Sequence, residues 1–214
     1  MASAAGQSIA IVDYGMGNRR SVEKAFEHVG APAFVTSDER EILEAPALVL
    51  PGVGAFPRAM ANLRASGLDA LIVERVESGV PVLGICLGMQ LAFERSEELG
   101  GDSGLAIVPG AVTALEAPGL KLPHIGWAEV EFCGSSELAR ALPDRGAFYH
   151  VHSYAARPTD ESDILGRSTY GTEFVTAVAR GSFFGVQFHP GKSSTLGLRL
   201  LGAFAELSRR ALAT

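Results

Sequence analysis

The chain has 214 residues, 47% of them hydrophobic and 20% charged, and a formal net charge of −6 at pH 7. This length and composition fit a compact globular protein with a sizeable core, and the negative balance gives no electrostatic basis for binding nucleic acid. No apolar run approaches the roughly 20 residues that span a bilayer, and two cysteines are too few for a disulfide framework, so we expect a cytoplasmic protein that binds neither membranes nor nucleic acid.

The N-terminal half alternates short apolar segments with helical patterns. Residues 1–8 lack the features of a signal peptide, so we predict a disordered tail before a single domain at 9–214. Asn18 is placed to cap a first helix that Gly30 ends. The predicted elements, in chain order, are strands at 8–13, 33–35 and 47–50, helical segments at 57–78 with a break near Gly67, a strand at 80–85, and a helix from Leu87.

The second half carries shorter predicted strands, at 128–132, 148–152, 173–179 and 183–188, and a last helix at 194–211. Strands that alternate with helices are typical of a parallel sheet covered on both faces. The predicted fold class is therefore α/β, with an open, mostly parallel mixed sheet flanked by helices.

A cysteine stands between the strand at 80–85 and the following helix, with a glycine two residues to either side in Gly84-Ile-Cys86-Leu-Gly88. This spacing is the thiol version of the nucleophile elbow, in which a sharp turn lifts the reactive atom to the carboxyl edge of the sheet. The N-terminus of the following helix favours the thiolate, so we expect a lowered thiol pKa. A buried structural cysteine is the alternative interpretation.

Two further segments qualify as partners of this cysteine. His189 follows the strand at 183–188 and is a candidate general base, although a single histidine after a strand is more often structural. The glycines of Pro51-Gly52-Val53-Gly54 can direct backbone N–H groups inward, as an oxyanion hole requires, although an ordinary turn also explains them. His150 and His152 share a strand face but lack the cysteine or carboxylate spacing of a metal site, and we predict neither metal nor cofactor.

GICLGMQ, PGVGAF and GVQFHP, in this order, resemble the segments of the triad-type (class I) glutamine amidotransferases, whose fold is flavodoxin-like. Further segments, DYGMGN at 13–18, PHIGW at 123–127, VHSY at 151–154 and Lys192-Ser193, resemble the glutaminase subunit of imidazole glycerol phosphate synthase. The similarity runs from about residue 9 to residue 204.

The resemblance implies a role for each matching position. Cys86 is the nucleophile that releases ammonia from glutamine through a thioester, and His189 moves the protons. The positions implied for the oxyanion hole are Gly52, Val53, Gly54 and Leu87; those for the substrate's amino acid end are Gln90, Glu98, Ser153 and Tyr154.

The same resemblance implies a partner, a (β/α)8-barrel cyclase that receives the ammonia and makes imidazole glycerol phosphate and an aminoimidazole carboxamide ribotide in histidine biosynthesis. The positions implied to face it are Asn18, Trp127, Tyr149 and Lys192. Exposed tryptophan and tyrosine are favoured interface anchors.

One position departs from the family. The triad glutamate expected after His189-Pro190 is replaced by Gly191, and loss of the orienting acid in a serine triad lowers the rate by about 10⁴. Three interpretations stay open: a substitution introduced into this sequence, replacement in function by another acid such as Glu173 or Asp163, or a subunit with weak glutaminase activity that mainly binds its partner. A glutaminase that serves another synthase is a further alternative, which PHIGW and VHSY disfavour.

Overall fold

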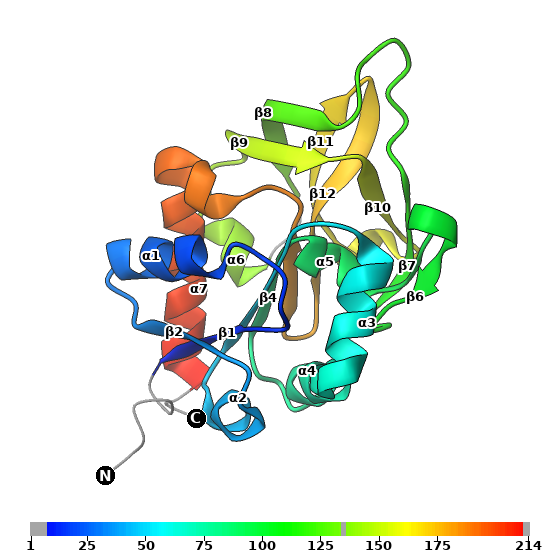
Figure 1. The fold of residues 1–214 in the computed structure, drawn as a ribbon. Helices are drawn as coiled ribbons and strands as arrows, with labels where there is room; N and C mark the ends of the chain where they lie inside the picture. The colour runs from blue at the N-terminus through cyan, green and yellow to red at the C-terminus, as the bar shows by residue number, and fades with distance from the viewer. Residues whose placement is uncertain (1–7, 134–135, 212–214) are drawn as a thin grey trace.

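Strands from both halves of the chain form one mixed sheet between two layers of helices, in a computed structural model that describes residues 8–133 and 136–211 (Figure 1). The tail predicted at residues 1–8 lies, apart from Ser8, outside the described residues.

The centre of the sheet is parallel. Its strands are, in spatial order, β2 (Ala33–Thr36), β1 (Ile9–Val12), β3 (Leu48–Gly52), β4 (Val82–Cys86) and β13 (Phe183–Val186). Apolar residues fill β1, β4 and β13 without alternation, because both faces of these strands are covered.

The sheet continues beyond β13 mainly with antiparallel pairs. The strands there are, again in spatial order, β12 (Thr172–Arg180), β10 (Tyr154–Pro158), β7 (Val108–Ala114), β5 (Phe93–Ser96) and β6 (Asp102–Ser103). A branch leaves β12 through β11 (Ile164–Tyr170), β8 (His124–Phe132) and β9 (Arg145–His152). The predicted α/β class with an open mixed sheet is confirmed.

Helices cover the two faces of the parallel strands (Figure 1). One face carries α1 (Arg19–His28), α6 (Glu137–Arg140) and α7 (Ser194–Ala211); the other carries α2 (Glu39–Glu44), α3 (Phe56–Ser66), α4 (Leu68–Glu77) and α5 (Leu87–Leu91). Alternate residues of β1 point to opposite faces, so Ile11 packs in the layer of Phe26 and Phe204, whereas Val12 packs in the layer of α3 and α4. The predicted long helices are confirmed, including the break at Gly67.

Strand register brings three carboxyl ends together. Gly52 of β3 lies opposite Cys86 of β4, and Val186 of β13 lies opposite Ile85. Because neighbouring parallel strands end at one edge, the residues that follow β13 meet the turn that follows β4.

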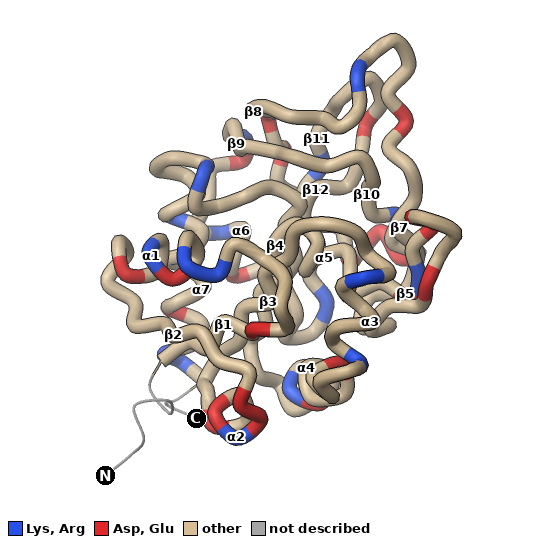
Figure 2. Tube along the Cα trace, in the orientation of Figure 1, with Lys and Arg blue, Asp and Glu red and all other residues tan. Residues whose placement is uncertain are grey.

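Charges are dispersed along the chain. Acidic and basic residues are interspersed over most elements (Figure 2). No helix in the part of the chain that the structure describes is long and apolar enough to cross a membrane.

Candidate active site

Cys86 occupies a strained turn at the end of β4. Its φ of 56° and ψ of −113° lie outside the regions that L-residues usually adopt, and such strain costs about 1–3 kcal/mol. The turn connects β4 directly to α5, as the nucleophile elbow predicts.

The two flanking glycines are required by close backbone approach. A Cβ at Gly88 would lie 1.8 Å from the carbonyl oxygen of Leu50, and a Cβ at Gly84 would lie 2.7 Å from the carbonyl oxygen of Gly88. No side chain fits at either position without moving the backbone, which gives a steric reason for both glycines of the elbow.

The thiol of Cys86 is protonated in this arrangement. Sγ donates to the carbonyl of Val151 at 3.8 Å and accepts from Nε2 of Gln187 at 3.7 Å. Burial raises its pKa to about 11, outweighing the opposing hydrogen bond from the Leu87 N–H. The expectation of a lowered thiol pKa is wrong for this state, because α5 has only five residues and the sulfur is buried.

His189 is held by its backbone, and its ring is free of hydrogen bonds in the described structure. Its N–H donates to the carbonyl of Tyr149 at 2.9 Å, and its carbonyl accepts from the hydroxyl of Ser193 at 2.7 Å. Burial first, and then the charge of Lys192, lowers the pKa of the ring to about 4. The imidazole is therefore neutral at pH 7 and can accept a proton.

A cavity of about 220 Å³ brings most of the predicted site residues together. Those that line it are Val53, Gly54, Cys86, Leu87, Gln90, Glu98, Ser153, Tyr154 and His189. Of the remaining predicted site positions, Gly52 lies behind the lining and Gly191 faces a second cavity.

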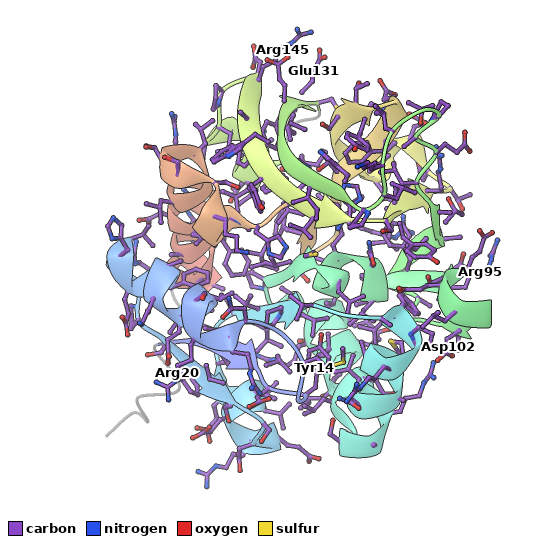
Figure 3. The ribbon with its side chains drawn as sticks, turned by 45° about the horizontal axis from the view of Figure 1, so that its top comes forward. Tyr14, Arg20, Arg95, Asp102, Glu131 and Arg145 are labelled. Atoms are coloured by element: carbon purple, nitrogen blue, oxygen red, sulfur yellow. The ribbon has the colours of Figure 1, made fainter. Side chains whose placement is uncertain are left out.

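The glycine turn after β3 is packed tightly from behind. A Cβ at Gly52 would lie 2.8 Å from the Tyr14 hydroxyl and 2.9 Å from the Gly88 nitrogen, and Gly54 has a φ of +100°. Tyr14, which is labelled in Figure 3, is buried, and its hydroxyl donates to the carbonyl of Pro51 at 2.7 Å. The backbone before the turn is thus fixed, whereas Val53, with 44% of its surface exposed, borders the cavity.

Two polar residues of the cavity lining are held by hydrogen bonds to the rest of the protein. Nε2 of Gln90 donates to the Tyr154 carbonyl at 3.2 Å and to Oε1 of Gln187 at 2.9 Å. Glu98 accepts from the Phe56 N–H at the start of α3, across 2.8 Å. The Glu98 carboxylate therefore connects the N-terminus of α3 to the cavity.

Three buried histidines extend from the cavity wall into the β8–β9 region. His150 and His152 donate from Nδ1 to the carbonyls of Phe148 and Tyr154, so their Nε2 atoms are acceptors. Nε2 of His150 accepts from Thr176 at 2.7 Å, and Nε2 of His152 accepts from Nδ1 of His124 at 3.1 Å. All three rings are neutral, because burial lowers the pKa of His150 to about 3, that of His152 to about 4, and that of His124.

The predicted partner-facing residues form one surface beside the cavity. Trp127 and Tyr149 lie opposite each other in the β8–β9 pair, with ring centroids 6.1 Å apart. Nζ of Lys192 lies 5.6 Å from the Tyr149 ring, and Asn18 shares a cavity with Lys192. Trp127 is 54% exposed, which is unusual for the one tryptophan of a chain.

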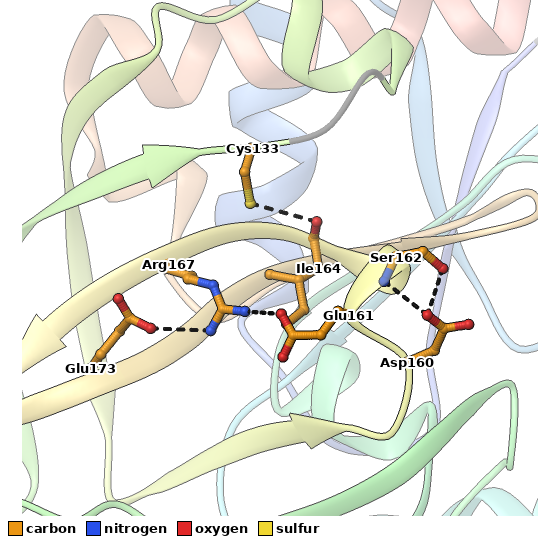
Figure 4. Close-up of polar contacts among 7 residues, drawn as sticks. All are labelled: Cys133, Asp160, Glu161, Ser162, Ile164, Arg167 and Glu173. Atoms are coloured by element: carbon orange, nitrogen blue, oxygen red, sulfur yellow. Dashed lines mark hydrogen bonds and ion pairs between the residues drawn. The ribbon is translucent and has the colours of Figure 1, made fainter.

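Neither acid considered as a substitute contacts His189. Glu173 pairs with Arg167 at 3.1 Å, in a network that also includes Glu161 (Figure 4). The buried carboxylate of Asp163 pairs with Arg180 at 3.0 Å. The interpretation that either acid replaces the triad glutamate is not supported.

Two residues of the site were not singled out from the sequence. Gln187 joins the sulfur of Cys86 to Gln90, and Ser193 accepts from the Tyr149 N–H at 3.0 Å while it donates to His189. Both belong to segments that the resemblance quoted, but their roles depend on distant contacts. Among the described residues, no group of three or more His, Cys, Asp or Glu side chains is arranged to hold a metal ion.

Comparison with known proteins gives one consistent result. The family model "Glutamine amidotransferase class-I" matches residues 10–205. Imidazole glycerol phosphate synthase subunit HisH of Moorella thermoacetica is 53% identical over 203 residues, 95% of this chain and 96% of that protein. The subunit of the same name from Bacillus cereus (strain G9842) is 49% identical, over 92% of this chain and 93% of that protein.

Solved structures share the fold at much lower identity. A crystal structure of a glutamine amidotransferase superposes with a TM-score of 0.72 at 21% identity, covering 94% of this chain and 98% of that one. PurLQS from Thermotoga maritima gives a TM-score of 0.67 at 17% identity, covering 96% of this chain and 97% of the other.

Proposed function

This chain belongs to the class I glutamine amidotransferase family and, within it, to the glutaminase subunits of imidazole glycerol phosphate synthase, and on that premise we propose how its residues act. Cys86 attacks the side-chain amide of glutamine, and His189 transfers the protons. The observation that carries the assignment is that a strained cysteine and a neutral histidine line one cavity with the predicted substrate-binding residues.

The first half of the reaction forms a thioester. His189 takes the thiol proton of Cys86, and the sulfur bonds to the amide carbon of glutamine, whose oxygen becomes an oxyanion. Backbone N–H groups of residues 52–54 and of Leu87 stabilise that oxyanion. When the carbon–nitrogen bond breaks, His189 returns the proton to the leaving nitrogen and ammonia departs.

The second half restores the enzyme. His189 removes a proton from water, and the resulting hydroxide bonds to the thioester carbon. The carbon–sulfur bond then breaks, and His189 gives its proton to the departing sulfur, which releases glutamate and restores the thiol and the neutral imidazole. Glu98 binds the substrate's ammonium group, since a carboxylate is its natural partner, while Gln90 and residues 153–154 bind the other polar groups at the amino acid end. These residues are supported by their places around the cavity.

The resting site is not aligned for attack. The thiol proton points to the Val151 carbonyl rather than to His189, and the thiol pKa is high. We infer that binding of the partner subunit reorients the Cys86 thiol so that its proton points toward His189. The exposed surface formed by Trp127, Tyr149 and Lys192 is the face that we assign to the (β/α)8-barrel cyclase, and ammonia passes to that subunit.

Catalysis is impaired by Gly191. The His189 ring has no carboxylate partner in the described structure, so nothing fixes its tautomer or stabilises the imidazolium. The loss in a serine triad is about 10⁴, and a cysteine site loses less, because a thiol is the stronger nucleophile. The same observation favours a second candidate function, a catalytically weak subunit that mainly binds the cyclase.

The deciding experiment measures glutamate release by the complex with its cyclase partner and cyclase ligand. We expect Gly191→Glu to be about 10² to 10⁴ faster than the unmodified chain and Cys86→Ala to be inactive. Equal rates for the unmodified chain and Gly191→Glu would show that His189 needs no acid here. Inactivity of both in a complex that has assembled would leave the binding-subunit function.

A further inference from the structure

A second cavity lies on the other side of His189. It measures about 120 Å³, and its rim contains the exposed residues Asn18, Ser21 and Lys192. Its floor is apolar and includes Ile85, together with Ala25 and Leu201. It thus offers polar contacts at its opening and hydrophobic contacts at its base, with room for several water-sized groups, each needing at least about 10–15 Å³.

The charges around this cavity favour an anion. No Asp or Glu lines it, and the ammonium of Lys192 has an aromatic contact with Tyr149 but no carboxylate partner in the described structure. His189 borders both cavities, and its ring likewise lacks a hydrogen bond in the described structure. An imidazole N–H and an ammonium on one rim are the donors that a carboxylate accepts from.

Gly191 leaves this space unfilled. A Cβ built on it would lie 3.4 Å from Cβ of Ala25 and 3.8 Å from the Ser21 carbonyl oxygen, which are contacts of ordinary or slightly tight length. Its φ lies outside the left-handed region, so its backbone does not demand glycine. The cavity can therefore be filled either by a side chain at position 191 or by a small molecule from solution.

We propose that this cavity binds a short-chain monocarboxylate, whose carboxylate accepts from the His189 ring and pairs with Lys192 while its alkyl tail packs on Ile85, Ala25 and Leu201. Bound there, the carboxylate orients the imidazole toward Cys86 and stabilises the imidazolium during each proton transfer. The activity of the subunit thereby depends on a diffusible acid. This inference rests on the proposed glutaminase reaction.

Binding is tested first, without catalysis. Propionate is titrated into the subunit while NMR records the ring signals of His189. We expect a saturable shift, with weaker effects of formate, which has no alkyl tail, and none of propionamide, which has no charge. Gly191→Gln is the matched control, because its side chain fills the cavity without adding a negative charge, and its His189 signals should not respond. Unchanged His189 signals in the unmodified chain overturn the proposal.

The kinetic test uses the cyclase complex at constant pH and ionic strength. Propionate is expected to raise kcat for glutamate release by about ten- to a hundredfold. This increase restores part of the rate that is lost when the triad acid is missing. Gly191→Glu should be fast without propionate and unaffected by it. If Gly191→Glu is fast but propionate does not activate the unmodified chain, the proposed carboxylate site is refuted while the proposed glutaminase reaction stands. A slow Gly191→Glu refutes the proposed triad chemistry, and the NMR titration then still decides binding.

Discussion

The side-chain amide of Gln187 donates to the sulfur of Cys86 across 3.7 Å, although the two residues lie at the ends of different strands and 101 positions apart in the sequence. The oxygen of the same Gln187 amide accepts a hydrogen bond from the side-chain amide of Gln90. A buried pair of amides therefore connects Cys86 to the lining of the cavity.

Gln187→Leu removes this donor and should raise the thiol pKa further, because Gln187 is one of the groups that lower it. A hydrogen bond of about 1 kcal/mol corresponds to roughly a fivefold smaller thiolate fraction. The measurement is the rate of Cys86 alkylation by iodoacetamide against pH, in a Cys133→Ser background because Cys133 is exposed and would react as well. An unchanged rate profile would mean that the Gln187 contact does not act on the sulfur.

Ser193→Ala should weaken both stability and turnover. It removes the hydroxyl between the Tyr149 N–H and the His189 carbonyl, so we expect a loss of about 1–2 kcal/mol in unfolding free energy and a fall in kcat of roughly tenfold. Ser182→Ala is the matched control, because its hydroxyl also donates to a backbone carbonyl, that of Val76, but at the opposite end of β13. The role assigned to Ser193 fails if both variants lower kcat equally.

Trp127→Ala should weaken binding of the cyclase without unfolding the subunit, since more than half of the side chain is exposed. An interface anchor contributes at least about 2 kcal/mol, which corresponds to a Kd increase of roughly thirtyfold by calorimetry. Leu43→Ala, an exposed apolar residue on α2, serves as the control and should leave the Kd unchanged. If Trp127→Ala and the unmodified chain bind the cyclase with equal affinity, the partner must bind to another face of the subunit.

The buried histidines should make folding stability depend on pH. Their folded pKa values, about 3 for His150 and about 4 for His152, lie below the unfolded value of about 6.5. The unfolded chain therefore binds more protons, and stability is complete above pH 6.5 and falls as the pH drops toward 4. The two groups together give a slope of up to about 2.7 kcal/mol per pH unit.

Urea unfolding between pH 5 and 6.5 measures this slope, together with the contributions of His124 and His189, whose pKa values burial also lowers, before most carboxylates titrate. Replacing both members of one buried pair, His150→Phe with Thr176→Val, removes one titrating ring without leaving the hydroxyl unpaired. We expect the slope to fall by up to about 1.4 kcal/mol per pH unit, the limit for one ring that is protonated in the unfolded chain and neutral in the folded one. A slope that does not change would assign the pH dependence to other groups.

The sequence was sufficient for the parts of the fold that depend on local pattern. The apolar runs of β1, β3, β4 and β13 and the helical spacing of α1, α3, α4 and α7 were predicted, as were the glycines that flank Cys86. Five strands (β5, β6, β7, β10 and β11) and two helices (α2 and α6) were missed. Some of the reasons can be identified: β7 contains Pro109 and Gly110, β10 ends in Pro158, β6 has two residues, α6 has four, and α2 is largely charged.

The site was less predictable, because its properties arise between distant segments. The sequence pointed to Cys86 and His189, but the raised thiol pKa follows from burial of the sulfur in the folded protein, which no local pattern encodes. The cavity at Gly191 likewise depends on where α1 packs. The substitution was visible in the sequence, whereas the space it leaves was not.

Because β4 and β13 are parallel, the catalytic residues lie at the carboxyl ends of both strands. The turns that precede the strands lie together at the opposite edge of the sheet, where the chain can be altered. The turns before these strands contain Gly79 and Gly181, where an added side chain would meet nothing within 4 Å, and the two turns are joined by the Val82 N–H and the Ser182 carbonyl. An affinity tag or fluorescent reporter loop inserted there would sit a full strand length from Cys86. The subunit thus provides its own attachment point for immobilisation or single-molecule work, in which turnover could be followed on an anchored complex.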